Sequence, residues 1–200
     1  MSLHWDERYN RKEYVYGSTP NVFFENQLTD LKPGDILLPC EGEGRNALFA
    51  AQSNWNVVAF DSSEVGKNKA MALAAQNNVS YDYQILDVNE ANFEPESFDV
   101  IALIYAHFKP QLRSKFHATI QGWLKPGGKI ILEAFNPNQL NYNSGGPKDL
   151  DMLYSTDILY KDFEGMKIEL IETSTIVLDE GAFHQGDADV IRFVAQKVQR

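Results

Sequence analysis

Short, continuously apolar runs alternate with longer segments of helical periodicity, and this alternation constrains the fold more than any other feature of the sequence. Residues 36–38, 57–60 and 100–105 have the unbroken apolar composition of strands that are buried on both faces. Residues 46–53 and 64–76 favour helices between these strands, and Pro110 suits the first turn of another helix. Alternating strands and helices predict a mostly parallel sheet with helices on both faces.

The second half of the chain adds a different connection. Further strands are expected at 81–86 and 129–135, and a polar loop and a short helix at 136–154 and 156–163. Residues 167–178 and 188–197 favour two long strands, and the segment between them is too short for a crossover helix, so they are predicted to pair as an antiparallel hairpin.

The expected architecture is therefore α/β, with a doubly wound, mostly parallel, seven-stranded sheet that ends in a C-terminal antiparallel hairpin. One domain is expected over residues 1–200. Residues 1–30 are rich in aromatic side chains, which are interpreted either as a lid over a site or as ordinary core.

The composition limits the classes of partner. The chain has 28 acidic and 18 basic residues, a formal net charge of −10, and no cluster of lysine or arginine. Nucleic acids and anionic membranes are therefore disfavoured, and a small-molecule substrate is expected. No apolar run has the ~20 residues of a membrane span, and no signal peptide is recognisable. A single cysteine rules out an internal disulfide and favours a cytoplasmic location. No Cys/His cluster has the spacing of metal ligands, so no metal site is expected. The oligomeric state stays open.

Glycines and acids stand where three of the predicted strands end. Gly42 and Gly44 follow the first strand, Asp61 ends the second and Asp87 ends the third. Because open α/β sheets bind ligands at the carboxyl ends of their strands, these residues are expected to form one site. The glycines let backbone N–H groups approach a ligand, and the carboxylates can accept hydrogen bonds from ribose hydroxyls and an adenine amino group.

This set resembles the motifs of methyltransferases that use S-adenosylmethionine (SAM). Residues 38–46, Leu-Pro-Cys-Glu-Gly-Glu-Gly-Arg-Asn, look like the glycine-rich first motif of that family, and residues 123–129 look like the segment that leads into its fifth strand. Asp61 and Asp87 match its second and third motifs. The resemblance implies the Rossmann-like class I methyltransferase fold, SAM as the cofactor, and a set of cofactor-binding residues: Glu41, Gly42, Gly44, Asp61, Ser62, Asp87, Val88 and Tyr105.

Two positions depart from the family pattern. An acid usually stands where this chain has Leu38, and the first glycine usually stands where it has Cys40. In the family that acid commonly helps to hold the methionine amino end of SAM. Glu41 and Glu43 are the two candidates to replace it.

Two other functions stay open at this point. The pattern Gly42-x-Gly44-x-x-Ala47, with Asp61 about 20 residues on, also satisfies the fingerprint of an NAD(P)-dependent oxidoreductase. The acid missing at Leu38 would also suit a protein that binds SAM without turning it over.

The C-terminal stretch is similar to a narrower group, the tellurite-resistance and thiopurine methyltransferases. The similarity includes Glu180-Gly181, His184 and residues 191–195, and the N-terminal Tyr16-Gly17 is also similar to the tellurite-resistance group. In the tellurite-resistance group the matching His and Arg lie in the active site, which implies catalytic roles for His184 and Arg192, although Gln185 stands where a second Arg is usual. The resemblance favours a sulfur, selenium or tellurium acceptor, or another small metabolite, over an oxygen acceptor that would need His184 as a base.

Two further histidines are placed by the pattern. His107 follows the fourth strand and is expected either to face the site or to cap the next helix. His117 lies away from the apolar face of that helix, which carries Leu112, Phe116, Ile120 and Trp123, and is expected to be exposed to solvent.

Overall fold

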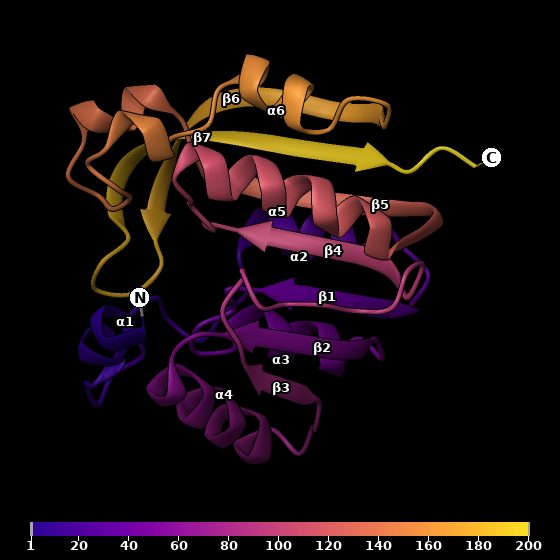
Figure 1. The fold of residues 1–200 in the computed structure, drawn as a ribbon. Helices are drawn as coiled ribbons and strands as arrows, with labels where there is room; N and C mark the ends of the chain where they lie inside the picture. Colours follow the sequence, from indigo (N-terminus) through magenta and orange to yellow (C-terminus); the bar gives the residue numbers. More distant parts are fainter. Residues whose placement is uncertain (1, 200) are drawn as a thin grey trace.

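The computed structural model describes residues 2–199 and contains one seven-stranded sheet (Figure 1). The strand order is β3-β2-β1-β4-β5-β7-β6. β1 to β5 are parallel, whereas β7 is antiparallel to both of its neighbours, β5 and β6. The strands are β1 (Asp35–Pro39), β2 (Asn56–Asp61), β3 (Asp82–Ile85), β4 (Phe98–Ile104), β5 (Leu124–Phe135), β6 (Lys167–Asp179) and β7 (Gln185–Gln196). The predicted mostly parallel sheet with a C-terminal hairpin is confirmed.

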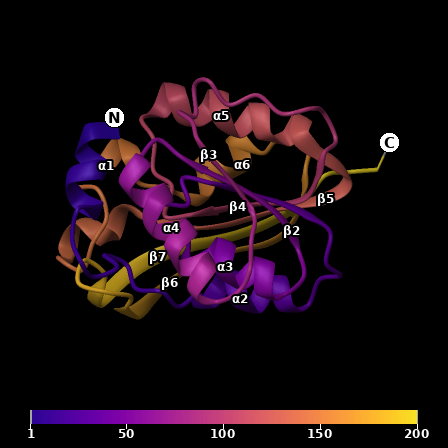
Figure 2. The same cartoon turned by 90° about the horizontal axis from the view of Figure 1, so that it is seen from below.

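Helices cover both faces of the sheet (Figure 2). On one face, α2 (Val22–Thr29), α3 (Arg45–Gln52) and α4 (Glu64–Gln76) contribute buried side chains such as Phe24, Ala47 and Ala70 to one core cluster. On the other, α5 (Pro110–Trp123) and α6 (Thr156–Asp162) contribute Phe116 and Leu159 to a second cluster. The sheet is therefore doubly wound, as predicted. Within residues 2–199, no helix is long and apolar enough to span a membrane.

The connection from α5 into β5 differs from the prediction. A strand was expected to start at Lys129, but β5 begins at Leu124, directly after α5. Leu124 pairs with Phe98 and Lys129 with Val100, so residues 125–128 form an irregularity within the paired strand. The predicted stop of the helix at Lys125-Pro126-Gly127-Gly128 is therefore misplaced, because α5 already ends at Trp123 and that segment lies within β5. β7 likewise begins at Gln185, three residues before the expected start.

The prediction for His117 is wrong. Its side chain is completely buried, at 0% exposure, and its Nδ1 lies 2.9 Å from Oδ2 of Asp162. α6 packs over this side of α5, so Asp162 reaches the imidazole and Phe163 stacks on it with ring centroids 4.8 Å apart. The helix therefore buries a polar side as well as its apolar stripe, because Asp162 of α6 bonds to Nδ1 of the imidazole.

An N-terminal helix, α1 (Ser2–Tyr9), packs against α4 at the carboxyl edge of the sheet. Oδ1 of Asp6 accepts hydrogen bonds from the Ser63 hydroxyl at 2.6 Å and from the Val65 N–H at 3.2 Å, where α4 begins. Nζ of Lys69, on α4, donates to the carbonyl oxygens of Tyr9, Arg11 and Glu13. Figure 1 shows α1 beside the tip of the β6–β7 hairpin, so both segments border the same edge.

Candidate functional site

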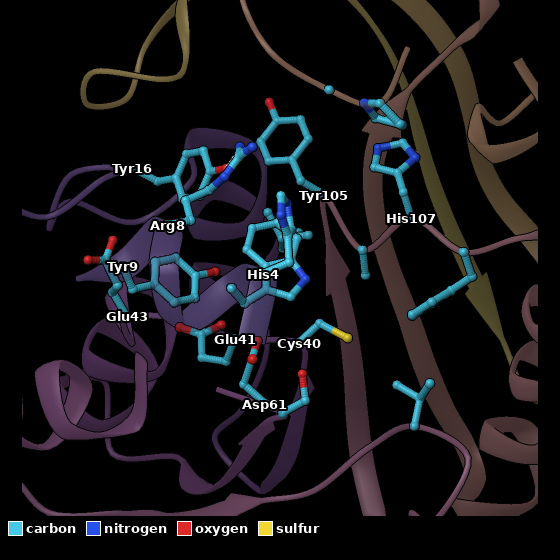
Figure 3. Close-up of a pocket in the computed structure, with 18 of the residues that line it drawn as sticks. His4, Arg8, Tyr9, Tyr16, Cys40, Glu41, Glu43, Asp61, Tyr105 and His107 are labelled. Atoms are coloured by element: carbon cyan, nitrogen blue, oxygen red, sulfur yellow. Dashed lines mark hydrogen bonds between the residues drawn. The ribbon is translucent and has the colours of Figure 1, made fainter. Parts of the chain in front are cut away.

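A cavity of about 410 Å³ opens at the carboxyl ends of the central strands (Figure 3). Four parts of the chain line it: the N-terminal segment with α1, the ends of β1, β2, β3 and β4, the end of β5 with the loop that follows it, and the β6–β7 loop. This is the edge where an open α/β sheet is expected to bind a ligand. Seven of the ten predicted site residues line the cavity, namely Glu41, Asp61, Ser62, Asp87, Val88, Tyr105 and His184.

Asp61 ends β2 inside this cavity and is 6% exposed. Its Oδ1 accepts the Ser63 N–H at 2.9 Å and its Oδ2 accepts the Gly42 N–H at 3.1 Å. Burial raises the pKa of Asp61 to about 6, although these two N–H groups act in the opposite direction. The carboxylate is thus oriented by backbone and can accept further hydrogen bonds from hydroxyl groups of a ligand.

The glycines of the first motif support the cavity without lining it. Gly42 and Gly44 both have positive φ, 59° and 86°. A Cβ at Gly42 would lie 2.5 Å from the Tyr9 hydroxyl oxygen, and one at Gly44 would lie 2.5 Å from the Ala70 methyl carbon. A side chain at either position would therefore displace α1 or α4. The Gly42 N–H, which was expected to approach a ligand, is donated to Asp61.

The end of β3 provides a second acid. Leu86, Asp87 and Val88 line the cavity, and Asp87 is half-buried. Its Oδ1 accepts the backbone N–H and the side-chain amide of Asn89, both at 2.9 Å. The other carboxylate oxygen has no hydrogen-bond partner among residues 2–199 and can accept one from a ligand.

The two departures from the family motif have different structural outcomes. Leu38 is buried in the core at 1% exposure, so this position offers no carboxylate to a ligand. Cys40 adopts φ 57°, the left-handed region where glycine is unstrained, and its side chain lines the cavity. Burial raises the pKa of the Cys40 thiol, which keeps it protonated at neutral pH. Cys40 therefore adopts a backbone conformation that would suit a glycine.

Glu41 and Glu43, the candidates to replace the missing acid, both line the cavity and both bind other parts of the protein. Oε1 of Glu41 accepts the N–H groups of Asn46 and Ala47, each at 2.8 Å, and so caps the start of α3. Burial raises the pKa of Glu41 to about 7 against these hydrogen bonds. Oε2 of Glu43 accepts the Val15 N–H at 2.7 Å, and its other oxygen pairs with Lys69. Glu43 therefore ties the N-terminal segment to the motif.

His184 enters the cavity from the β6–β7 loop as part of a charged group of three residues. Its Nδ1 lies 3.1 Å from Oε2 of Glu180, and the same oxygen accepts a hydrogen bond from Nη2 of Arg45 at 3.0 Å. Burial alone would raise the pKa of Glu180, but the hydrogen bond from His184 and the charge of Arg45 outweigh it and lower that pKa to about 2. Because Glu180 is ionised, Nδ1 of His184 carries the proton that points to it.

The remaining nitrogen of His184 can act as a base. Nε2 has no hydrogen-bond partner within residues 2–199. Burial lowers the pKa of His184, although the carboxylate of Glu180 opposes the change, so the neutral imidazole is favoured at neutral pH. The rings of Tyr16, Tyr105 and Phe135 surround it with centroids 4.5, 4.7 and 5.4 Å away. An imidazole that is neutral, oriented and partly enclosed is suited to accept a proton.

Arg192 lies outside the cavity. It stands in β7 opposite Glu133 of β5, and its Nε donates to Oε2 of Glu133 at 2.6 Å. Glu133 is 1% exposed, and its Oε1 accepts hydrogen bonds from the hydroxyl of Tyr105 at 2.9 Å and the amide of Asn21 at 2.6 Å. The guanidinium therefore neutralises a buried carboxylate next to the site, and the expected contact with a substrate has no support in this geometry.

His107 lines the cavity, the first of its two predicted placements. Its Nδ1 lies 2.7 Å from the carbonyl oxygen of Met152, and its Nε2 accepts the Phe135 N–H at 3.2 Å. Burial lowers the pKa of His107 to about 4. With both ring nitrogens bonded and the ring neutral, it holds the loop after β5 against the sheet. The residue at the N-cap of α5 is Lys109.

Three residues of this site were not singled out from the sequence: Arg45, Glu180 and Glu133. Arg45 follows Gly44 in the first motif, and Glu180 precedes His184 by four residues, so both stood inside segments that carried a signal. Glu133 stood in a strand expected to be buried, where an acid needs a partner. The structure also brings His4, Trp5, Arg8, Tyr9 and Tyr16 from the N-terminal segment to the cavity wall. Among residues 2–199 no group of three or more His, Cys, Asp or Glu is arranged to hold a metal ion.

Comparison with known proteins agrees with this arrangement. Residues 36–128 match a family model described as a methyltransferase domain. Phosphoethanolamine N-methyltransferase 1 of Arabidopsis thaliana is 29% identical over 112 residues, which cover 53% of this chain and 22% of that protein. The chain thus spans about a fifth of the length of this curated relative.

Solved structures share the fold over almost the whole chain. A structure from work on the conversion of a disulfide bond into a thioacetal group during echinomycin biosynthesis has a TM-score of 0.79 at 17% identity and covers 98% of this chain and 89% of its own. TehB from Haemophilus influenzae has a TM-score of 0.74 at 14% identity, with 98% and 66% covered. Residues 36–128 thus resemble a methyltransferase domain, and the solved structures share the fold of this chain.

Proposed function

We propose that this chain transfers the methyl group of SAM to a small acceptor, and that His184 accepts the proton that the acceptor loses. The observation that carries the proposal is that Nε2 of His184 is unpartnered within residues 2–199 in the cavity that also contains Asp61 and Asp87. A binding protein without turnover has no need of a neutral imidazole oriented by Glu180.

The residues present fit SAM. Asp61 and Asp87 offer carboxylate oxygens where a ribose and an adenine amino group need acceptors, and Ser62 and Val88 stand beside them. When bound, SAM supplies an electrophilic methyl group on a sulfonium, so the chain has only to place the acceptor in line and remove its proton. The assignments of Glu41 and Tyr105, which line the cavity, to the cofactor stay part of this proposal, whereas Gly42 and Gly44 act by leaving room for Tyr9 and Ala70.

The acceptor side is bounded by aromatic rings and His184. Tyr16, Tyr105, Phe135 and Met152 form walls that suit a soft, polarisable atom, because sulfur packs well against aromatic rings. A thiol or another sulfur, selenium or tellurium acceptor, as in the tellurite-resistance group, is therefore the preferred class. An oxygen acceptor is second, and it needs the base more, because a hydroxyl ionises far less readily than a thiol.

The first experiment is a panel of small thiols, selenols, tellurite and hydroxyl compounds offered to the purified protein with SAM, read as release of S-adenosylhomocysteine (SAH). Thermal stability with SAH, with NAD(H) and with NADP(H) is recorded in parallel, since ligand at about 100 times its dissociation constant stabilises by roughly 2.7 kcal/mol. Stabilisation by SAH without SAH release from any acceptor would favour the protein that binds SAM without turnover.

A second experiment tests the role of His184 with the best acceptor. His184→Ala is expected to lower turnover about 10²- to 10⁴-fold for a hydroxyl, with SAH affinity almost unchanged. For a thiol the loss should shrink as the pH rises toward ~8.5, where the thiolate forms without help. A loss that is small and independent of pH for every acceptor would refute the role as a base.

A further inference from the structure

Arg8 reaches the cavity from α1, and among residues 2–199 it has no acidic partner (Figure 3). Its guanidinium lies over the rings of Trp5 and Phe183, 5.4 and 5.1 Å from their centroids, and Nη1 donates to the hydroxyl of Tyr16 at 3.0 Å. These contacts hold the planar group at the cavity wall and use one of its five donors, leaving the others for a ligand.

The other partly or fully buried arginines behave differently. Arg45 pairs with Glu180 at 3.0 Å, Arg113 with Asp162 at 2.9 Å and Arg192 with Glu133 at 2.6 Å. Within residues 2–199, no carboxylate lies within 4.0 Å of the guanidinium of Arg8. A half-buried cation of this kind gains most from an anionic partner, and a guanidinium matches the two oxygens of a carboxylate.

We propose that Arg8, oriented by Tyr16, binds the carboxylate of the methionine part of SAM. The inference rests on the proposed function. α1 lies over the part of the cavity assigned to the cofactor, because its Tyr9 packs on Gly42 and its Asp6 bonds to the start of α4, two residues after Asp61. SAM brings a carboxylate to every turnover, whichever acceptor is used.

The proposed bond from Arg8 to SAM would also add to the contacts that hold the N-terminal segment in place. Asp6 and Lys69 tie α1 and the chain after it to α4 through hydrogen bonds, and Glu43 ties Val15 to the first motif. A bond from Arg8 to the cofactor adds a ligand-dependent contact to these fixed ones. Bound SAM should therefore hold α1 more firmly against the cavity.

The test compares SAH with its decarboxylated analogue, which differs only in lacking the carboxylate, by calorimetry. The wild-type protein should bind SAH at least ~10-fold more tightly than the analogue, the range expected for a hydrogen-bonded charge pair. Arg8→Gln should weaken SAH to the level of the analogue and leave the analogue unchanged, and Arg8→Lys should restore part of the difference. Arg11→Gln is the matched control, since Arg11 is exposed, lies 5.0 Å over the same Phe183 ring and does not line the cavity.

Three results would overturn the inference. Equal weakening of SAH and analogue by Arg8→Gln would mean that Arg8 only packs α1. Unchanged SAH affinity with a raised KM for an anionic acceptor would assign Arg8 to the acceptor. A wild-type protein that binds SAH and its analogue equally would exclude a carboxylate contact altogether. If the wild type bound neither, the proposed function itself would fail, which is a distinct outcome.

Discussion

Glu180 is the charged centre of the proposed acceptor side, and replacing it by glutamine tests how this part of the cavity is held together. Its carboxylate accepts hydrogen bonds from Arg45, His184 and Asn21, and its side chain is only 13% exposed. The shift of its pKa from the ordinary 4.5 to about 2 corresponds to about 3 kcal/mol at 1.36 kcal/mol per pKa unit. Glu180→Gln should therefore lower the free energy of unfolding by about 3 kcal/mol at pH 7, or the melting temperature by roughly 6–12 °C.

The pH dependence gives this prediction its sign. The folded-state pKa of Glu180 lies below its unfolded value, so its contribution is complete above pH 4.5 and is lost as the pH falls toward 2. At pH 3 about half of the difference between wild type and Glu180→Gln should remain. Urea unfolding at pH 7 and pH 3 measures both values, with Glu172→Gln as the control because that side chain is 51% exposed. An equal loss at the two pH values would show that shape, not charge, explains the effect.

Three further substitutions test other parts of the site. Asp61→Ala should weaken SAH binding at least ~10-fold through lost hydrogen bonds to a charged acceptor, with the fold retained; unchanged affinity by calorimetry would place the ribose elsewhere. Arg192→Ala leaves the carboxylate of Glu133 buried and unneutralised, so urea unfolding should show a loss of about 3–5 kcal/mol. Full stability with abolished turnover would instead return Arg192 to the acceptor. Cys40→Gly should stay within ~1 kcal/mol of wild type because the left-handed backbone suits glycine, whereas Cys40→Val should be clearly less stable by thermal unfolding; equal melting temperatures would refute the strain argument.

Much of the proposed cofactor side was predictable because the features that build it are local. The apolar runs mark the strands, and the direction of a parallel sheet then places every strand end at one edge. Asp61, Ser62, Asp87 and Val88 line the cavity for this reason. The motif glycines were also recognisable, but only the structure shows that they make room for Tyr9 and Ala70.

His117 and Arg192 show which contacts local sequence patterns do not predict. The helical periodicity of α5 places His117 on its polar side, and nothing within the helix indicates that α6, about 40 residues later, packs there with Asp162 and Phe163. Arg192 and His184 lie in the same hairpin, and the same family resemblance predicted a catalytic role for both. The register of β7 against β5 sets Arg192 on Glu133, whereas the loop carries His184 to the cavity.

The succession of strands and helices, the antiparallel hairpin and the carboxyl-edge acids can be inferred from the sequence alone, since periodicity, turn residues and loop lengths act between neighbours in the chain. Which charges meet depends instead on the packing of distant elements. The Arg45–Glu180 pair joins residues 135 positions apart, and the Asn21–Glu133 bond joins residues 112 apart. The same holds for Arg8, which reaches the cavity because Asp6 and Lys69 dock α1 on α4. Such contacts depend on how separately formed elements pack, and a buried charge selects its partner only once that packing exists.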